Sequence, residues 1–159
     1  MQNEERADRT RRVLFVCSSG GHLAQLLELD HWWKDHECRW VTFDLPDARS
    51  RLGKGGFIPA HYPTTRNVIN AAKNLRLARR VIDEFDPHVV ISNGAAIAVP
   101  FFIAARRRFV PTVFVEVYDR VDSRTLTGRL VRPWTTSFLV QWPEQQELNP
   151  GSTLIGTLY

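Results

Sequence analysis

The stretch VLFVCSSGGH, Val13 to His22, decides the fold. Its first five residues are a short apolar run rich in β-branched side chains, the pattern of a strand buried on both faces of a parallel sheet. Residues 18–22 follow as a turn with two adjacent glycines, and from Leu23 to Trp33 apolar residues recur at helical spacing. A strand, a glycine turn and a helix in this order predict the start of a βαβ unit.

The rest of the chain repeats that alternation. We expect strands at 38–43, 57–60, 89–92, 112–115, 137–140 and, at an edge, 153–155, and helices at 67–85, 97–105 and 123–131. Residues 44–56 lack such a pattern and are predicted to form an irregular loop. The pattern as a whole predicts an α/β fold, a Rossmann-like three-layer domain with a mostly parallel sheet. The single domain is expected to span residues 13–159, after a flexible basic tail at 1–12.

Composition limits the function. The chain has 159 residues, 43% hydrophobic and 24% charged, which suffices for one sizeable core. A net charge of +4 favours anionic partners, but the arginines are dispersed and no basic-aromatic stripe indicates nucleic-acid binding. Cys17 and Cys38 form neither a zinc motif nor a disulfide framework. The polar start of the chain predicts neither a signal peptide nor a membrane anchor, and hence a cytoplasmic protein.

The first candidate site is the loop of Ser18, Ser19, Gly20, Gly21 and His22. Glycines let a ligand approach the backbone, free amides at a helix start attract anions, and hydroxyls add donors, so the loop is a candidate phosphate cradle. The alternative is a tight turn with no ligand. His22 is either a hydrogen-bond donor or general base at this loop or a capping, partly buried histidine.

Two further loops follow predicted strands. Asn93 and Gly94 repeat the pattern of small residues before a helix, and loops at the carboxyl ends of parallel strands share one crevice. In the third loop, Glu116 is either a structural cap or a base that deprotonates a sugar hydroxyl. Arg120 and Arg124 are candidate phosphate contacts.

An apolar run at 97–105 leads directly into the arginines at 106–108. This composition is typical of segments that bind anionic membrane surfaces, although a buried helix with a solvated end has the same pattern. The run is too short to span a bilayer.

Four motifs together resemble one family: SSGGH at 18–22, ISNGAAIAVPFF at 91–102, VEVYDRVDSRTLTGRL at 115–130 and VQWPE at 140–144. The chain resembles bacterial capsular and exopolysaccharide glycosyltransferase subunits and their eukaryotic relative, the membrane-anchoring subunit of the dolichol-linked N-acetylglucosaminyltransferase. The resemblance spans about residues 13–157. It implies the N-terminal half of a GT-B fold, similar to the acceptor domain of the enzyme that glycosylates undecaprenyl-linked muramoyl-pentapeptide.

The resemblance also implies an activity. A companion subunit would supply the C-terminal GT-B half and most of the UDP-sugar site, so the enzyme would be active only with that partner. This chain would bind the polyprenyl-diphosphate-linked acceptor through residues 18–22, Asn93 and Gly94, at the inner face of the cell membrane. His22 or Glu116 would be the general base, with no cofactor and no metal, because Asp119 and Asp122 are spaced wrongly for a D-x-D pair.

Two other functions fit the sequence. The chain is alternatively a non-catalytic enhancer or scaffold that recruits a complete glycosyltransferase to the membrane. A free-standing nucleotide-binding enzyme is disfavoured because the G-x-G-x-x-G fingerprint is absent, although Asp44 could bind a ribose.

Overall fold

A computed structural model describes residues 10–158. These residues contain one seven-stranded sheet with the strand order β3-β2-β1-β4-β5-β6-β7. Every neighbouring pair is parallel. The strands are β1 (Arg12–Val16), β2 (Glu37–Phe43), β3 (Ile58–Ala60), β4 (Val89–Ser92), β5 (Thr112–Val115), β6 (Ser137–Val140) and β7 (Thr153–Leu154). The predicted α/β fold with a mostly parallel sheet is confirmed.

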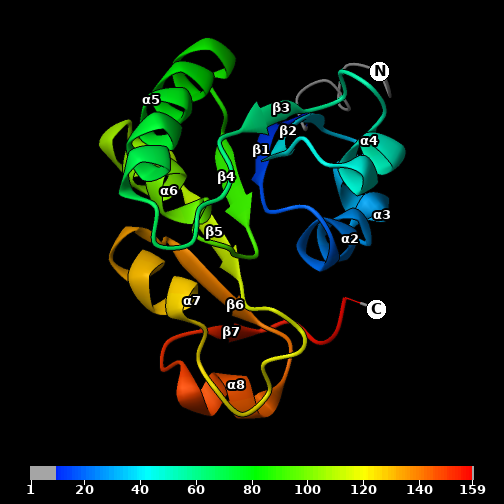
Figure 1. The fold of residues 1–159 in the computed structure, drawn as a ribbon. Helices are drawn as coiled ribbons and strands as arrows, with labels where there is room; N and C mark the ends of the chain where they lie inside the picture. The colour runs from blue at the N-terminus through cyan, green and yellow to red at the C-terminus, as the bar shows by residue number, and fades with distance from the viewer. Residues whose placement is uncertain (1–9, 159) are drawn as a thin grey trace.

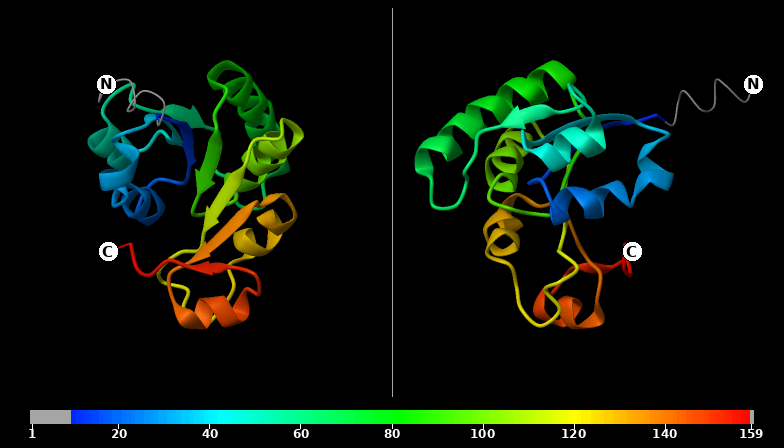
Figure 2. Two further views of the ribbon diagram at one scale, coloured as in Figure 1. Left: turned by 180° about the vertical axis from the view of Figure 1, so that it is seen from behind. Right: turned by 45° about the vertical axis from the view of Figure 1, so that its right-hand side comes forward.

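Helices cover both faces of the sheet, as Figures 1 and 2 show. They are α2 (Gly21–Leu27), α3 (Asp30–Trp33), α4 (Pro46–Leu52), α5 (Val68–Phe85), α6 (Ala98–Arg107), α7 (Leu126–Val131) with the 3₁₀ turn η1 (Arg132–Trp134), and α8 (Pro143–Leu148). The layer of α5, α6 and α7 lies on one side and the layer of α2, α3 and α4 on the other.

Strand β1 explains the two layers, because successive side chains of a strand point to opposite faces. Leu14 and Val16 pack with the α5–α6 side, whereas Val13, Phe15 and Cys17 pack with the α2 side. All five side chains are fully buried. The apolar run that begins at Val13 therefore belongs to an interior strand of the sheet, between β2 and β4, as its continuous apolar pattern predicts.

The sequence reading of residues 44–56 as a loop is wrong over most of its length. Pro46 opens α4 at its first turn, where a missing amide costs nothing, and Gly53 ends the helix with a φ of +78°. Only Ala48 of this helix is buried. A helix with so little apolar surface leaves almost no periodicity in the sequence.

Other boundaries also differ from the prediction. The expected helix at 23–33 is divided into α2 and α3 by a turn at Glu28 and Leu29. The helix expected from residue 123 begins only at Leu126, after the Thr125 hydroxyl has accepted the Gly128 amide as an N-cap. The tail expected at 1–12 already belongs to β1 at Arg12, and its first nine residues lie outside the described part of the chain.

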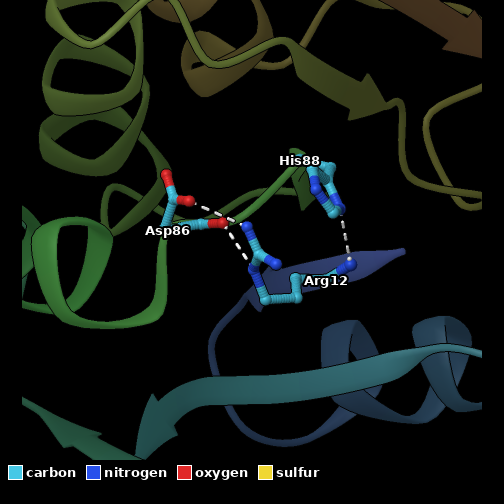
Figure 3. A network of polar contacts seen from close by, with 3 residues as sticks. All are labelled: Arg12, Asp86 and His88. Atoms are coloured by element: carbon cyan, nitrogen blue, oxygen red, sulfur yellow. Dashed lines mark hydrogen bonds and ion pairs between the residues drawn. The ribbon is translucent and has the colours of Figure 1, made fainter. Parts of the chain in front are cut away.

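One polar network joins the amino end of β1 to the residues just before β4 (Figure 3). Arg12 donates through Nε to the Asp86 carbonyl at 2.7 Å and through Nη2 to the Asp86 carboxylate at 2.8 Å. The Arg12 amide donates to His88 Nδ1 at 2.9 Å. These contacts fix the start of β1 against the turn between α5 and β4, which sets β1 beside β4 along the sheet.

The strand order reverses direction at β1, because β2 lies on one side of it and β4 on the other. The helix after β1 therefore covers one face, and the helix after β4 covers the opposite face. In such sheets a crevice opens between the two loops at the carboxyl ends of the strands. The loops at 18–22 and 93–97 lie at this point.

Candidate functional site at the strand order reversal

His22 and Asn93 connect the first two loops across the crevice. His22 Nδ1 lies 3.2 Å from the carbonyl oxygen of Asn93, and Asn93 Nδ2 donates to the carbonyl of His22 at 2.8 Å. Asn93 is fully buried and also contacts Gln25 Oε1 at 3.3 Å. The two loops therefore form one rigid unit, as the shared-crevice argument predicts.

Gly94 makes this close approach possible. Its φ is +129°, and a Cβ atom there would lie 2.9 Å from Cε1 of the His22 ring. Any larger residue would be strained in its backbone and would displace the imidazole. Gly94 therefore positions His22, which is a role that the phosphate-loop prediction did not include.

The hydrogen bond to Asn93 decides how His22 is protonated. A carbonyl oxygen only accepts, so a neutral His22 must carry its proton on Nδ1 to make this bond, which leaves Nε2 as the proton acceptor. Burial lowers the pKa of His22, against the raising effects of the Asn93 hydrogen bond and the Asp119 charge. The neutral, base-competent imidazole is therefore favoured near pH 7.

Two cavities meet at His22. One, of about 220 Å³, is lined by residues of all three predicted loops: His22, Asn93, Gly94, Ala95, Val117, Asp119, Arg120, Thr125 and Thr127. The other, of about 330 Å³, is lined by Gly21, His22, Gln25, Val117, Tyr118 and Asp119. His22, Asn93, Gly94 and Arg120 thus come together as predicted. Ser18, Ser19 and Gly20 line neither cavity.

Gly20 already has an anionic partner. Its amide donates to the carboxylate of Asp47 on α4. Gly20 has a φ of +79° and precedes α2. The amide expected to bind phosphate is thus bonded to a carboxylate that the sequence analysis placed in a loop, and a ligand anion must replace Asp47 to reach it.

Glu116 does not face the cavities. Only 1% of its surface is exposed, and its carboxylate accepts from the Thr125 hydroxyl at 2.9 Å and from the Val117 amide at 3.1 Å. Burial raises the pKa of Glu116, against the lowering effects of these hydrogen bonds and of the Arg120 charge. A Cβ at Gly128 would lie 2.8 Å from Glu116 Oε2, so α7 packs directly on the carboxylate. This geometry favours the structural alternative.

Two buried glutamines, Gln141 and Gln145, hold the third loop, which follows β5. Neither was identified from the sequence. Gln145 Nε2 donates to the carbonyls of Val117 at 2.7 Å and Arg120 at 3.1 Å, and its Oε1 accepts from the Gln141 amide at 2.8 Å. Gln141 Nε2 donates to the carbonyl of Glu116 at 2.9 Å. The motif at 140–144 had no assigned role in the sequence analysis. Gln141 within it and Gln145 directly after it form a brace for the loop that carries Asp119 and Arg120.

Arg124 lies elsewhere. It lines a separate cavity of about 270 Å³ with Arg129 and Arg132, and no residue of that cavity lines the two at His22. The predicted set of phosphate contacts is thus divided between two places. Between residues 10 and 158 no group of three or more His, Cys, Asp or Glu side chains could hold a metal ion.

The apolar run at 97–105 is part of the core rather than of the surface. Ile97, Phe101 and Phe102 are fully buried on the α5 side of the sheet. The arginines at 106–108 are exposed, and Arg108 pairs with Asp83. The buried-helix alternative therefore holds for the apolar part. No helix in the described range is long and apolar enough to cross a membrane.

A fold of this kind is one half of a GT-B enzyme. MurG from Acinetobacter baumannii superimposes with a TM-score of 0.73 at 18% identity, over 92% of this chain and 45% of that chain. UDP-N-acetylglucosamine 2-epimerase from Rickettsia bellii gives 0.72 at 13% identity, over 94% and 46%. The class of protein is therefore a Rossmann-like domain equivalent to one lobe of a two-lobed fold.

The chain belongs to the family described as oligosaccharide biosynthesis protein Alg14 like, whose profile matches residues 34–158. It is 30% identical to UDP-N-acetylglucosamine transferase subunit ALG14 of Yarrowia lipolytica, over 91% of this chain and 67% of that protein. The human subunit of the same name is 25% identical, over 92% and 82%.

A bacterial relative connects the family to MurG. The UDP-N-acetylglucosamine–N-acetylmuramyl-(pentapeptide) pyrophosphoryl-undecaprenol N-acetylglucosamine transferase of Erythrobacter litoralis is 31% identical over 87% of this chain, but over only 37% of its own length. The expected relation to the eukaryotic subunit and to the peptidoglycan enzyme is confirmed. The capsular and exopolysaccharide branch of the resemblance stays a prediction.

Proposed function

We propose that this chain is the acceptor-binding subunit of a two-component glycosyltransferase. The enzyme transfers a sugar, N-acetylglucosamine by analogy with the names of the relatives, from a UDP-sugar to a polyprenyl-diphosphate-linked saccharide in polysaccharide biosynthesis. A capsule or an exopolysaccharide is the product that the sequence motifs favour. The companion subunit carries the C-terminal GT-B half and most of the UDP-sugar site.

One observation carries this proposal. The chain matches 45% of MurG and brings His22, Asn93 and Arg120 together around one cavity at its strand ends. In a GT-B enzyme the reaction takes place between the lobes, and the relatives are named as subunits of a transferase, which supports a companion subunit as the source of the second lobe. We therefore expect activity only in the presence of that partner.

His22 is the general base in this mechanism. The acceptor hydroxyl oxygen attacks the anomeric carbon of the donor sugar, its proton passes to His22 Nε2, and the bond between that carbon and the UDP oxygen breaks with inversion. The Asn93 carbonyl holds the Nδ1 proton and aligns the ring during transfer. UDP leaves as the anion, stabilised by donors of the companion subunit. No metal or cofactor is needed for this step.

The diphosphate of the acceptor binds along the glycine loops. Arg120 lines the His22 cavity and is exposed, so its guanidinium can donate to phosphate oxygens. Gly20, Gly21 and the hydroxyls of Ser18 and Ser19 complete the cradle after the Gly20 amide exchanges the Asp47 carboxylate for phosphate. Asn93 and Gly94 keep the opposite wall in place.

Membrane attachment is proposed to be peripheral, at the inner face of the cell membrane. Val68 is 81% exposed and Ile69 71% exposed on the first turn of α5, where water contact is unfavourable for apolar side chains. Val68 also lines an apolar cavity of about 580 Å³ between α5 and α6, and Arg66 lines it too. The first turn of α5 and this cavity are the candidate surface for lipid contact, and the run at 97–105 contributes to it only through Val99, Pro100 and Ile103.

The test is sugar transfer to membrane lipid by this chain alone, by the candidate partner alone and by the purified pair. We expect activity only in the pair, and its loss in His22→Ala while the complex still co-purifies. His31→Ala is the matched control, because His31 is exposed on α3 and lines no cavity at the site. Glu116→Gln, compared with the exposed Glu144→Gln, separates a base from a structural carboxylate.

The scaffold function gives a different result in the same assay. Full activity in the partner alone, with His22→Ala affecting membrane recruitment but not turnover, would establish a non-catalytic enhancer. Activity in this chain alone, or tight UDP binding by it, would establish a free-standing enzyme. Either outcome contradicts the split-enzyme proposal.

A further inference from the structure

Three arginines gather around a cavity that the proposed reaction does not use. This cavity, of about 270 Å³, lies beside α7 and is lined by Arg124, Gly128, Arg129, Arg132, Asn149 and Pro150. It contains no aspartate or glutamate among its lining residues. Its electrostatic potential is therefore positive, in contrast to the His22 cavity, which Asp119 also lines.

The three arginines have no carboxylate partner within the described residues. Other arginines do: Arg49 pairs with Asp44, and Arg108 pairs with Asp83. Guanidinium groups repel one another when they share a cavity, and a solvated surface would let such side chains separate. Three unpaired guanidinium groups around one cavity are the arrangement that binds a multiply charged anion in proteins.

The guanidinium of Arg132 is held in place at the lining of this cavity. Its Nη2 donates to the carbonyl of Pro150, and its guanidinium carbon lies 4.6 Å from the centroid of the Phe138 ring. Its Nη1 is buried and has no hydrogen-bond partner in the described part of the chain. A buried charged donor without a partner is costly, and the negative charge of an anion in the cavity would offset part of the cost of burying this guanidinium. A side chain held this way also loses little conformational freedom on binding.

We propose that this cavity is a phosphate-binding site, distinct from the acceptor site at His22. Two fork-shaped guanidinium groups at the exposed rim, those of Arg124 and Arg129, match the oxygens of a phosphate, and Arg132 contacts it from inside. A phosphate carries up to two negative charges, which suits three cations better than a carboxylate does. The phosphate belongs either to a lipid headgroup or to a water-soluble phosphate.

The first test is titration of inorganic phosphate into the full chain at constant ionic strength, followed by calorimetry. We expect saturable binding that is weakened on the order of tenfold or more in Arg132→Gln and in Arg124→Gln. Arg107→Gln is the matched control, because Arg107 is exposed at the end of α6 and has no described partner. If Arg132→Gln does not fold, the phosphate affinity of Arg124→Gln decides the question, because Arg124 is exposed and its replacement should leave the fold intact.

Binding at the glycine loops is distinguished by His22→Ala in the same titration. Phosphate binding that His22→Ala abolishes and the arginine variants retain belongs to the acceptor site and overturns this proposal. Equal affinity in Arg124→Gln and Arg107→Gln, or no saturable binding at all, overturns it too.

Vesicles identify the source of the phosphate. Phosphatidylcholine vesicles with and without phosphatidylglycerol are added to the phosphate titration. Competition that requires phosphatidylglycerol and is lost in Arg124→Gln supports the site with a lipid headgroup as its ligand. Phosphate binding that neither type of vesicle reduces supports the site with a water-soluble phosphate as its ligand.

Discussion

Replacing Gln145 by alanine tests whether the third loop depends on the brace beneath it. The side chain is fully buried and makes four hydrogen bonds. It donates to the carbonyls of Val117 and Arg120 at 2.7 and 3.1 Å and accepts from the amides of Gln141 and Trp142 at 2.8 and 3.3 Å. Alanine would leave all four backbone groups without these bonds.

The expected loss follows from those contacts. A net contribution of roughly 0.5–1.5 kcal/mol for each of the four bonds gives about 4 kcal/mol in the free energy of unfolding, from the middle of the range. For a domain of this size that corresponds to a fall in melting temperature of roughly 8–16 °C. Gln146→Ala is the matched control, because Gln146 is the exposed neighbour with a single 3.2 Å bond to the Ser152 carbonyl, and we expect a change below about 0.5 kcal/mol.

Urea unfolding measures the loss, and amide hydrogen exchange locates it. Protection of the amides in residues 116–125 should fall in Gln145→Ala and stay unchanged in Gln146→Ala. The reasoning is refuted if Gln145→Ala unfolds at the same urea concentration as the unmodified chain and the loop amides exchange at the same rate.

Four further outcomes are expected. Gly94→Ala should destabilise the chain by about 1–3 kcal/mol in urea unfolding, because its φ of +129° and the 2.9 Å approach to the His22 ring leave no room for a Cβ; an unchanged midpoint would show that the loops adjust freely. Because burial lowers the pKa of His22, the unfolded chain binds the proton more readily, so stability should fall as pH falls below about 6.5, and His22→Gln should reduce that fall; equal slopes in the two proteins would contradict it. Asp47→Ala should free the Gly20 amide and tighten pyrophosphate binding about tenfold by calorimetry, whereas weaker binding would mean that Asp47 shapes the loop. The Cys17 thiol, whose pKa burial raises to about 12, should resist a disulfide reagent until the chain is unfolded, and rapid labelling in the native state would refute that burial.

The sequence predicts the middle of the sheet well because the strands there are mostly apolar on both faces. Residues 13–17 and 89–92 have to be buried wherever the chain places them, and the glycines after the first strand leave a helix as the natural continuation. Helices whose buried side chains are polar cannot be predicted from hydrophobic periodicity in this way. In α8 the buried residue is Gln145, so hydrophobic periodicity gives no signal there and the helix was not predicted.

The candidate site could be predicted from the sequence in part: which loops meet, but not where each side chain points. Loops at the ends of parallel strands meet by topology, which is why His22, Asn93 and Arg120 were expected together and are found together. Side-chain direction is not set by topology. Arg124 lies four residues after Arg120 but lines another cavity, and the carboxylate of Glu116 faces Thr125, because the turn into α7 has its own hydrogen bonds.

The bond from the Leu158 amide to Gln141 Oε1, at 3.0 Å, has a practical consequence. Gln141 also donates to the Glu116 carbonyl, so the last described residue of the chain is two hydrogen bonds from the third loop. A purification tag or a fused partner attached beyond this point would exit beside the loop that carries Arg120. Fusions before Arg12, which begins β1 at the amino ends of the strands and thus far from the loops at the carboxyl ends, suit the transfer and binding assays better.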